Sequence, residues 1–330
     1  MKPKLWIMIV VFSTLTIYIA RYTTIDYINQ KIFENSPLYD HGYWINDNLC
    51  PDVVFLGSSM TKYSIVPGII NKNSHLKEGG TINLSADAAT PYEMYITYMK
   101  NKKKFSKTRI FFYSIEPWIF SKKYYQYKAY EKVLWTKEEW QYYMPQWDYY
   151  HSYKSSLFKL SIDAKPPKHK VKNYGYSKKY FNKSKSFRQS NKKDVLDFFR
   201  DDLYHNIAIS TFQLEYLKKL KEEVEKNHAE FIVLYIPNHI SYTEAIFKYN
   251  KAYNNVLSLL LTEHLGETKQ VGSYCPKYYY LKEEDFFDRF HLADTGARKF
   301  TQTLGGILNI PNTLKKKKIV LDYSCSNVSK

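Results

Sequence analysis

Short, almost uninterrupted apolar runs are the feature of this sequence that most restricts its fold. Residues 52–57 read DVVFLG, residues 109–113 read RIFFY and residues 230–236 read EFIVLYI. A strand of a parallel sheet is covered on both faces and is apolar throughout, whereas a half-exposed strand alternates apolar and polar residues. Weaker runs at 81–84 and 278–281 raise the expected number of strands to about five. The sequence therefore predicts a parallel sheet.

Helical patterns separate these runs. Residues 212–227 carry apolar side chains at helical spacing with charges between them: Leu214, Leu217, Leu220 and Val224. Strands that alternate with helices form βαβ units, so we expect an α/β fold with three layers, α/β/α. A long insertion, 121–205, lies between the third and fourth predicted strands and is rich in Tyr, Trp and Lys.

The N-terminus predicts a membrane anchor. Residues 5–20, LWIMIVVFSTLTIYIA, are uncharged, with Lys2 and Lys4 before them and Arg21 after them. The run is slightly short for a hydrocarbon core of about 30 Å, but flanking Lys and Arg side chains can reach the interface. We predict an uncleaved signal anchor within 1–22, with Met1 in the cytoplasm. A cleaved signal peptide is the alternative, although YIA is a poor cleavage sequence. Both interpretations export the rest of the chain.

The remaining organisation follows from composition. We expect a stalk at 23–50, a domain at 51–310 and a basic tail at 311–330. The formal net charge of +17 favours anionic partners, although an AT-rich genome gives the same Lys-rich composition. No nucleic-acid motif is present. The three cysteines form no CxxC pair, so no metal site is expected; one disulfide could form in an exported domain, but the sequence does not pair the cysteines.

Two short polar motifs fall where an α/β enzyme carries its chemistry. The GSS motif at 57–59 directly follows the first predicted strand, and ligands of open parallel sheets bind beyond the carboxyl ends of strands. Ser59 is a candidate nucleophile that needs a neighbouring base. The DRFH motif at 288–291 offers His291 as that base and Asp288 as the group that fixes its tautomer. Each motif alone also fits an ordinary loop or a surface histidine.

Together these motifs resemble those of the SGNH (GDSL-like) hydrolase family, whose sequence blocks follow this order. The GSS motif is similar to the first block, with Ser58 in place of the usual Asp and Ser59 as the nucleophile. Residues 83–93, NLSADAATPYE, are similar to the second block, and DRFH with the downstream Gly296 is similar to the fifth. The insertion is not covered. The resemblance implies an SGNH-like fold and a Ser-His-Asp triad.

Two positions near the expected oxyanion hole depart from the family pattern. The glycine that usually contributes a backbone donor falls on Ala88, whose N–H can do the same. The usual Asn after the third strand is replaced by Glu116, and an ionised carboxylate cannot donate a hydrogen bond. Membrane-anchored relatives that modify surface polymers, such as the D-alanine transfer protein of teichoic acids and the alginate O-acetylation proteins, often lack this Asn. Asn238, after the fourth strand, is a candidate substrate contact, although a structural role in its loop fits it better.

Resemblance to that branch implies acyl transfer to an envelope polysaccharide, or ester hydrolysis on one, through an acyl-Ser59 intermediate. It implies acetyl as the acyl group, a membrane-bound O-acyltransferase as its donor, a single-pass protein with an extracytoplasmic domain, and no cofactor. The polymer can be anionic or neutral, because the insertion offers Lys and aromatic side chains, which could equally form its own core. Two other hypotheses stay open: a non-catalytic polymer-binding scaffold, and a lipase or phospholipid esterase with the insertion as its lid.

Overall fold

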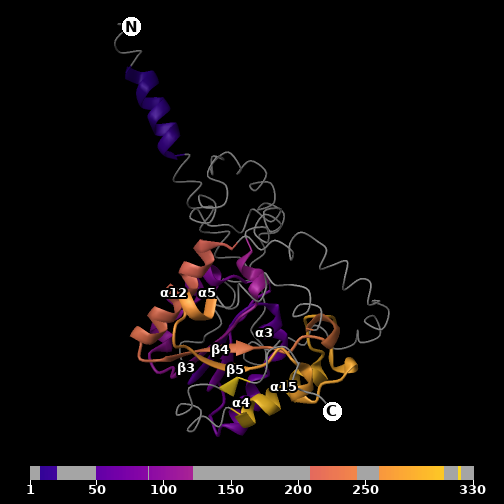
Figure 1. Cartoon of the computed structure of the whole chain (residues 1–330). Coiled ribbons are helices and arrows are strands. Elements are labelled where there is room, and N and C mark those ends of the chain that lie inside the picture. Colours follow the sequence, from indigo (N-terminus) through magenta and orange to yellow (C-terminus); the bar gives the residue numbers. More distant parts are fainter. Residues whose placement is uncertain are drawn as a thin grey trace. The chain divides into compact units, whose positions relative to one another are not determined.

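The structure is a computed structural model that describes residues 8–20, 50–87, 89–121, 209–243, 260–307 and 319–320. The chain divides into two compact units; residues 8–20 belong to one, and the other described segments belong to the second. The predicted stalk and nearly all of the predicted insertion lie outside the described residues. Figure 1 shows the second unit as a central sheet with helices.

Six strands, all parallel, form the sheet within the described residues. Their order is β2-β1-β3-β4-β5-β6. This confirms the predicted parallel α/β sheet. The strands span the following residues: β1 Val53–Leu56, β2 Thr81–Asn83, β3 Ile110–Ser114, β4 Glu230–Tyr235, β5 Lys269–Gly272 and β6 Ile319–Val320.

The first four predicted strands are present, but the predicted fifth strand at 278–281 is wrong. Pro276–Tyr279 instead forms the short 3-10 helix η6, and Tyr280 follows it in the left-handed conformation with φ of +53°. The Tyr279 hydroxyl accepts the Ser273 N–H at 2.7 Å, which fixes this turn below the end of β5. The fifth strand is Lys269–Gly272. Its polar first half gave no apolar signal.

Strand β6 lies inside the segment expected to be a basic tail. It pairs in parallel with β5, with Ile319 opposite Val271 and Val320 opposite Gly272. Two apolar residues directly after the lysine run thus extend the sheet by one short strand.

Helices cover both faces of the sheet (Figure 1). On one face α5 and α12 pack together, and on the other α15 packs against α3 and α4. The five helices span the following residues: α3 Ser59–Ser64, α4 Pro67–Asn73, α5 Pro91–Asn101, α12 Thr211–Lys226 and α15 Asp294–Ile307. Helix α12 matches the helix predicted at 212–227. This arrangement agrees with three layers.

Alternate residues of each strand point to opposite layers, as the pleat requires. Phe55 and Phe112, from neighbouring strands, stack with ring centroids 4.8 Å apart in the core cluster that includes residues of α15. Phe111 points the other way and contacts Tyr98 of α5 edge-on at 5.4 Å. Both faces of the central strands are therefore buried, which explains their uninterrupted apolar sequences.

The N-terminal unit is described over residues 8–20, which form one helix. Most of its large apolar side chains are exposed, among them Phe12 at 72%. The hydroxyls of Thr14 and Thr16 each donate to the carbonyl four residues earlier, at 2.8 Å, so these polar groups are satisfied within the helix. Within the described part of the chain, no helix combines the length and apolar character needed to span a bilayer. The predicted anchor, 1–22, also includes residues outside the described segments.

Candidate active site

The order of the strands places a topological switch point between β1 and β3. The chain passes from β1 outward to β2 and then returns to the other side of β1 to form β3. In open parallel sheets ligands bind in the crevice beyond the carboxyl ends of the strands at such a point. Ser58 and Ser59 directly follow β1, and Glu116 follows β3. The residues at this position are therefore the first to consider for chemistry.

A glycine makes the turn between β1 and the nucleophile position. Gly57 has φ of +153°, and a Cβ placed on it would overlap the hydroxyls of Ser114 and Thr61. The chain then enters α3, where Ser58 is the N-cap and its Oγ accepts the Met60 N–H at 3.2 Å. Ser59 is thus the first residue of the helix, directly beyond the strand end.

A tight loop between the short 3-10 helix η7, Glu283–Asp285, and α15 positions the histidine. Phe286 and Leu292 form an antiparallel bridge, and Ala293 N–H donates to the Asp285 carbonyl at 2.9 Å. Gly296 in the first turn of α15 lies against the Asp285 backbone so closely that a Cβ would overlap it. This packing fixes the loop that carries Asp288 and His291.

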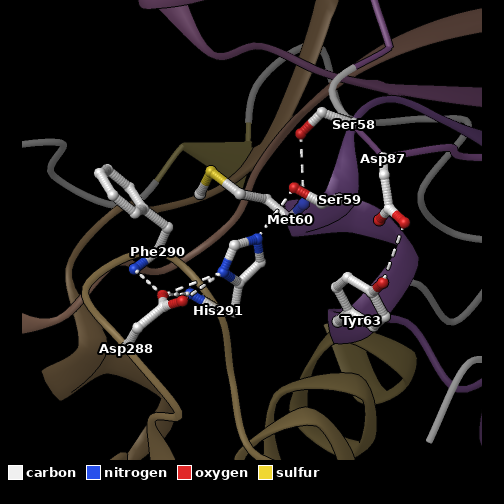
Figure 2. A network of polar contacts seen from close by, with 8 residues as sticks. All are labelled: Ser58, Ser59, Met60, Tyr63, Asp87, Asp288, Phe290 and His291. Carbon is white, nitrogen blue, oxygen red and sulfur yellow. Dashed lines mark hydrogen bonds and ion pairs between the residues drawn. The ribbon is translucent and has the colours of Figure 1, made fainter. Parts of the chain in front are cut away.

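Ser59, His291 and Asp288 lie in hydrogen-bonding contact in that order (Figure 2). The Ser59 Oγ is 2.9 Å from His291 Nε2. On the other side of the ring, His291 Nδ1 is 2.9 Å from Asp288 Oδ1 and 2.8 Å from Oδ2. The structure therefore brings together the three residues that the sequence singled out as nucleophile, base and orienting acid.

The environment of Asp288 determines the tautomer of the histidine. Burial raises the pKa of Asp288, but the hydrogen bond and charge of His291 and the N–H groups of Phe290 and His291 outweigh it, so its pKa is below the usual value. Both N–H groups donate to Asp288 Oδ1 at 2.8 Å. An ionised carboxylate only accepts. His291 Nδ1 must therefore carry the proton, which leaves the Nε2 lone pair facing the Ser59 hydroxyl.

A second carboxylate, that of Glu116, lies on the other side of the Ser59 turn. Its side chain is 2% exposed. The Ser58 hydroxyl donates to Oε1 and Oε2, at 2.5 and 2.6 Å, and the Ser114 hydroxyl donates to Oε1 at 3.3 Å. Burial raises the pKa of Glu116 from its ordinary 4.5 to about 7, although the Ser58 hydrogen bond, the charge of His291 and the Ser114 hydrogen bond all lower it.

Tyr63 is a site residue that the sequence reasoning missed. Its ring meets the His291 ring edge-on with centroids 5.6 Å apart, and its hydroxyl donates to Asp87 Oδ2 at 3.2 Å. Lys62 also contacts this carboxylate oxygen, at 3.0 Å. The sequence contained a signal for this residue, because in a helix that begins at Ser59 the residue four positions later lies on the same face, one turn along.

The other predicted site residues have different outcomes. Asn238 follows β4 and is 2% exposed; its N–H donates to the Tyr274 carbonyl at 3.0 Å, and its side-chain oxygen has no hydrogen-bond partner among the described residues. The neighbouring His239 N–H donates to the Arg289 carbonyl at 3.1 Å, so this loop contacts the loop that carries His291. Ala88 lies outside the described residues.

Of the two cysteines that the structure describes, one is in a disulfide and the other is not. Cys275, at the N-cap of η6, is disulfide-bonded, whereas Cys50 is a free thiol. Within the described segments no three His, Cys, Asp or Glu side chains gather as a metal site would require. A comparison of the chain with known protein-family models finds no match, and none of the curated proteins matches it.

Proposed function

We propose that this chain is a membrane-anchored serine acyltransferase or esterase of SGNH-like fold that acts on a cell-envelope polysaccharide. The observation that carries the proposal is the 2.9 Å contact between Ser59 Oγ and His291 Nε2 at the switch point of the sheet. A serine hydroxyl becomes a useful nucleophile when a base with the correct tautomer faces it. His291, oriented by Asp288, meets that requirement.

The first half-reaction transfers an acyl group to Ser59. His291 Nε2 takes the Ser59 proton while Oγ bonds to the acyl carbon of an ester donor. The ionised Asp288 carboxylate stabilises the imidazolium that forms. When the tetrahedral intermediate collapses, the bond to the leaving oxygen breaks and that oxygen takes the proton back from Nε2. The product is acyl-Ser59.

The second half-reaction reverses these roles. The hydroxyl of a sugar or of water gives its proton to His291 Nε2 and attacks the acyl carbon, and Ser59 leaves with the proton returned to it. Ser59 is the first residue of α3, so its N–H has no carbonyl one turn earlier to bind and is available to the oxyanion. Ala88 N–H remains the proposed second donor.

Location and substrate class rest on other features. A disulfide at Cys275 is typical of an oxidising, extracytoplasmic compartment. The exposed apolar side chains of helix 8–20, together with its internally satisfied threonines, suit the predicted signal anchor. The net charge of +17 favours a surface rich in anionic groups. The resemblance to envelope O-acetylation proteins supplies acetyl as the acyl group and a membrane-bound O-acyltransferase as its donor.

Two experiments test the proposal. The full-length protein should react with a fluorophosphonate probe, and Ser59→Ala should abolish the labelling. Cells that carry His291→Ala should have less acetyl ester on their surface polysaccharide than wild-type cells. Folded protein that does not label would support a non-catalytic scaffold. Labelling with unchanged polysaccharide, and fatty-acid release from phospholipid vesicles, would support a lipase instead.

A further inference from the structure

Glu116 is a buried carboxylate that the proposed mechanism does not use. Its side chain is 2% exposed, and in the part of the chain that the structure describes no Lys or Arg forms an ion pair with it. Burial of a carboxylate without a cation is unfavourable. Strongly perturbed acids of this kind are common at functional sites. The contacts of Glu116 indicate what it does there.

The carboxylate sets the direction of the hydrogen bonds before Ser59. Ionised Glu116 only accepts, so the Ser58 hydroxyl must donate to it, and the Ser58 lone pair is then directed to the Met60 N–H at 3.2 Å. A protonated Glu116 keeps an acceptor oxygen but adds a donor, so the Ser58 hydroxyl could then either donate or accept. Ser58 is fully buried, so the carboxyl group is its partner in place of water. Ionised Glu116 therefore fixes the Ser58 proton toward the carboxylate and leaves the Ser58 lone pairs for the N-cap contact of α3.

A second contact ties the same carboxylate to the other side of Ser59. The Ser114 hydroxyl at the end of β3 donates to Glu116 Oε1 at 3.3 Å, and Ser114 Oγ in turn contacts Thr61 Oγ1 of α3. Glu116 thus holds the residue before Ser59 directly and the residue two positions after it through Ser114. Misplacement of a reacting group by about 1 Å can lower a rate by about 10²-fold.

We propose that Glu116 is a positioning residue that holds Ser59 toward His291 through its contacts with Ser58 and Ser114. This inference rests on the proposed function. In the family that the chain resembles, the position of Ser58 is usually Asp and that of Glu116 is usually Asn. Compared with that pattern, the acidic residue and the neutral polar residue have exchanged positions in this chain. Glu116 accepts hydrogen bonds from the residues around Ser59, whereas the usual Asn donates one to the oxyanion.

The test is the rate of fluorophosphonate labelling of full-length protein, measured from about pH 5 to about pH 9. Glu116→Gln keeps the shape but loses the negative charge and replaces one acceptor oxygen with a donor NH₂ group, so labelling should slow by about 10- to 100-fold. Its pH profile should also differ from that of wild type near pH 7, where Glu116 titrates. Among the described residues, the titratable groups that interact with Glu116 are His291 and Tyr113. Burial raises the pKa of Tyr113 well above its usual value, so Tyr113 stays neutral throughout.

Three further variants separate positioning from a general structural effect. Ser58→Asp places two carboxylates in one buried contact and should label very slowly. The double variant Ser58→Asp with Glu116→Asn restores one acid and one neutral partner, and should label at least about tenfold faster than Ser58→Asp alone. Glu215→Gln is the matched control, because that carboxylate is 61% exposed on α12, and it should label like wild type.

The outcomes are distinguishable. Wild-type rate and profile in Glu116→Gln would overturn the inference, and so would a slower variant whose pH profile is identical in shape to that of wild type. If Glu116→Gln does not fold, the labelling rate of Ser58→Ala is measured instead. This variant removes the contact between Glu116 and the N-cap of α3. A wild-type labelling rate in Ser58→Ala would also overturn the inference. Absence of labelling in the wild type would instead overturn the proposed function and this inference with it.

Discussion

Replacement of Glu116 by Gln is expected to stabilise the folded protein at neutral and alkaline pH. Burial raises the pKa of this carboxyl from 4.5 to about 7, so ionisation is harder in the folded than in the unfolded chain. The difference is about 2.5 pKa units, and each unit corresponds to about 1.4 kcal/mol. The ionised carboxylate therefore lowers the free energy of unfolding by about 3 kcal/mol, which a neutral amide of the same shape avoids.

The sign of the pH dependence follows from proton binding. Below about pH 4.5 the carboxyl is protonated in both states, and wild type and variant should differ least. Between about pH 4.5 and 7 the unfolded chain loses this proton while the folded chain keeps it, so wild-type stability falls as pH rises. The stability of Glu116→Gln relative to wild type should therefore grow by about 3 kcal/mol across this window and then level off.

Denaturant unfolding of the purified full-length proteins at several pH values measures this difference. Titrating groups that do not interact with Glu116 contribute equally to both proteins and cancel in the comparison. The Glu215→Gln variant is the control for the same substitution at an exposed site. If Glu116→Gln gives a constant difference from wild type between about pH 4 and 9, the carboxyl does not titrate with a raised pKa, and the reasoning is refuted.

Three other changes have defined expectations. Asp288→Asn should slow fluorophosphonate labelling by about 10⁴-fold without loss of folded protein by circular dichroism, because an amide no longer fixes the His291 tautomer. Gly57→Ala should lower the free energy of unfolding by about 2–4 kcal/mol in the same denaturant assay, since its Cβ meets two buried hydroxyls. In the unfolded, non-reduced protein an alkylating reagent should modify Cys50 but not Cys275, as detected by mass spectrometry; early modification of Cys275 would contradict the disulfide.

Burial on both faces made the central strands predictable. Strands β1, β3 and β4 are enclosed by two helical layers, so nearly every position in them is buried and apolar, and the sequence shows this as uninterrupted apolar runs. Strand β5 escaped this signal because its first residue, Lys269, satisfies its charge by pairing with Glu230 on β4. The aromatic run at 278–281 was mistaken for a strand, because bulky residues also occur in turns. Here they belong to the turn that begins at Pro276.

The site was predictable to the extent that strand ends determine it. Ser59 and His291 are 232 positions apart. Ser59 follows β1, whose end the apolar pattern locates, whereas His291 was found by the DRFH motif and by no strand end. The direction of a side chain is a different matter. The sequence places Glu116 after β3, but only the structure shows that both of its oxygens turn toward Ser58 and away from water. The sequence places Tyr63 one helical turn after Ser59, but its contact with His291 depends on how α3 meets the loop that carries His291.

The buried carboxylate of Glu116 has an energetic consequence. A neutral side chain at the position of Glu116 would make the fold more stable by about 3 kcal/mol near neutral pH. Proteins tolerate such a burden where a site needs a group that the fold alone would not favour. An ionised acceptor beneath Ser58 fixes the start of α3, and with it the hydroxyl that faces His291. The instability at Glu116 and the order at Ser59 are then two results of one buried charge.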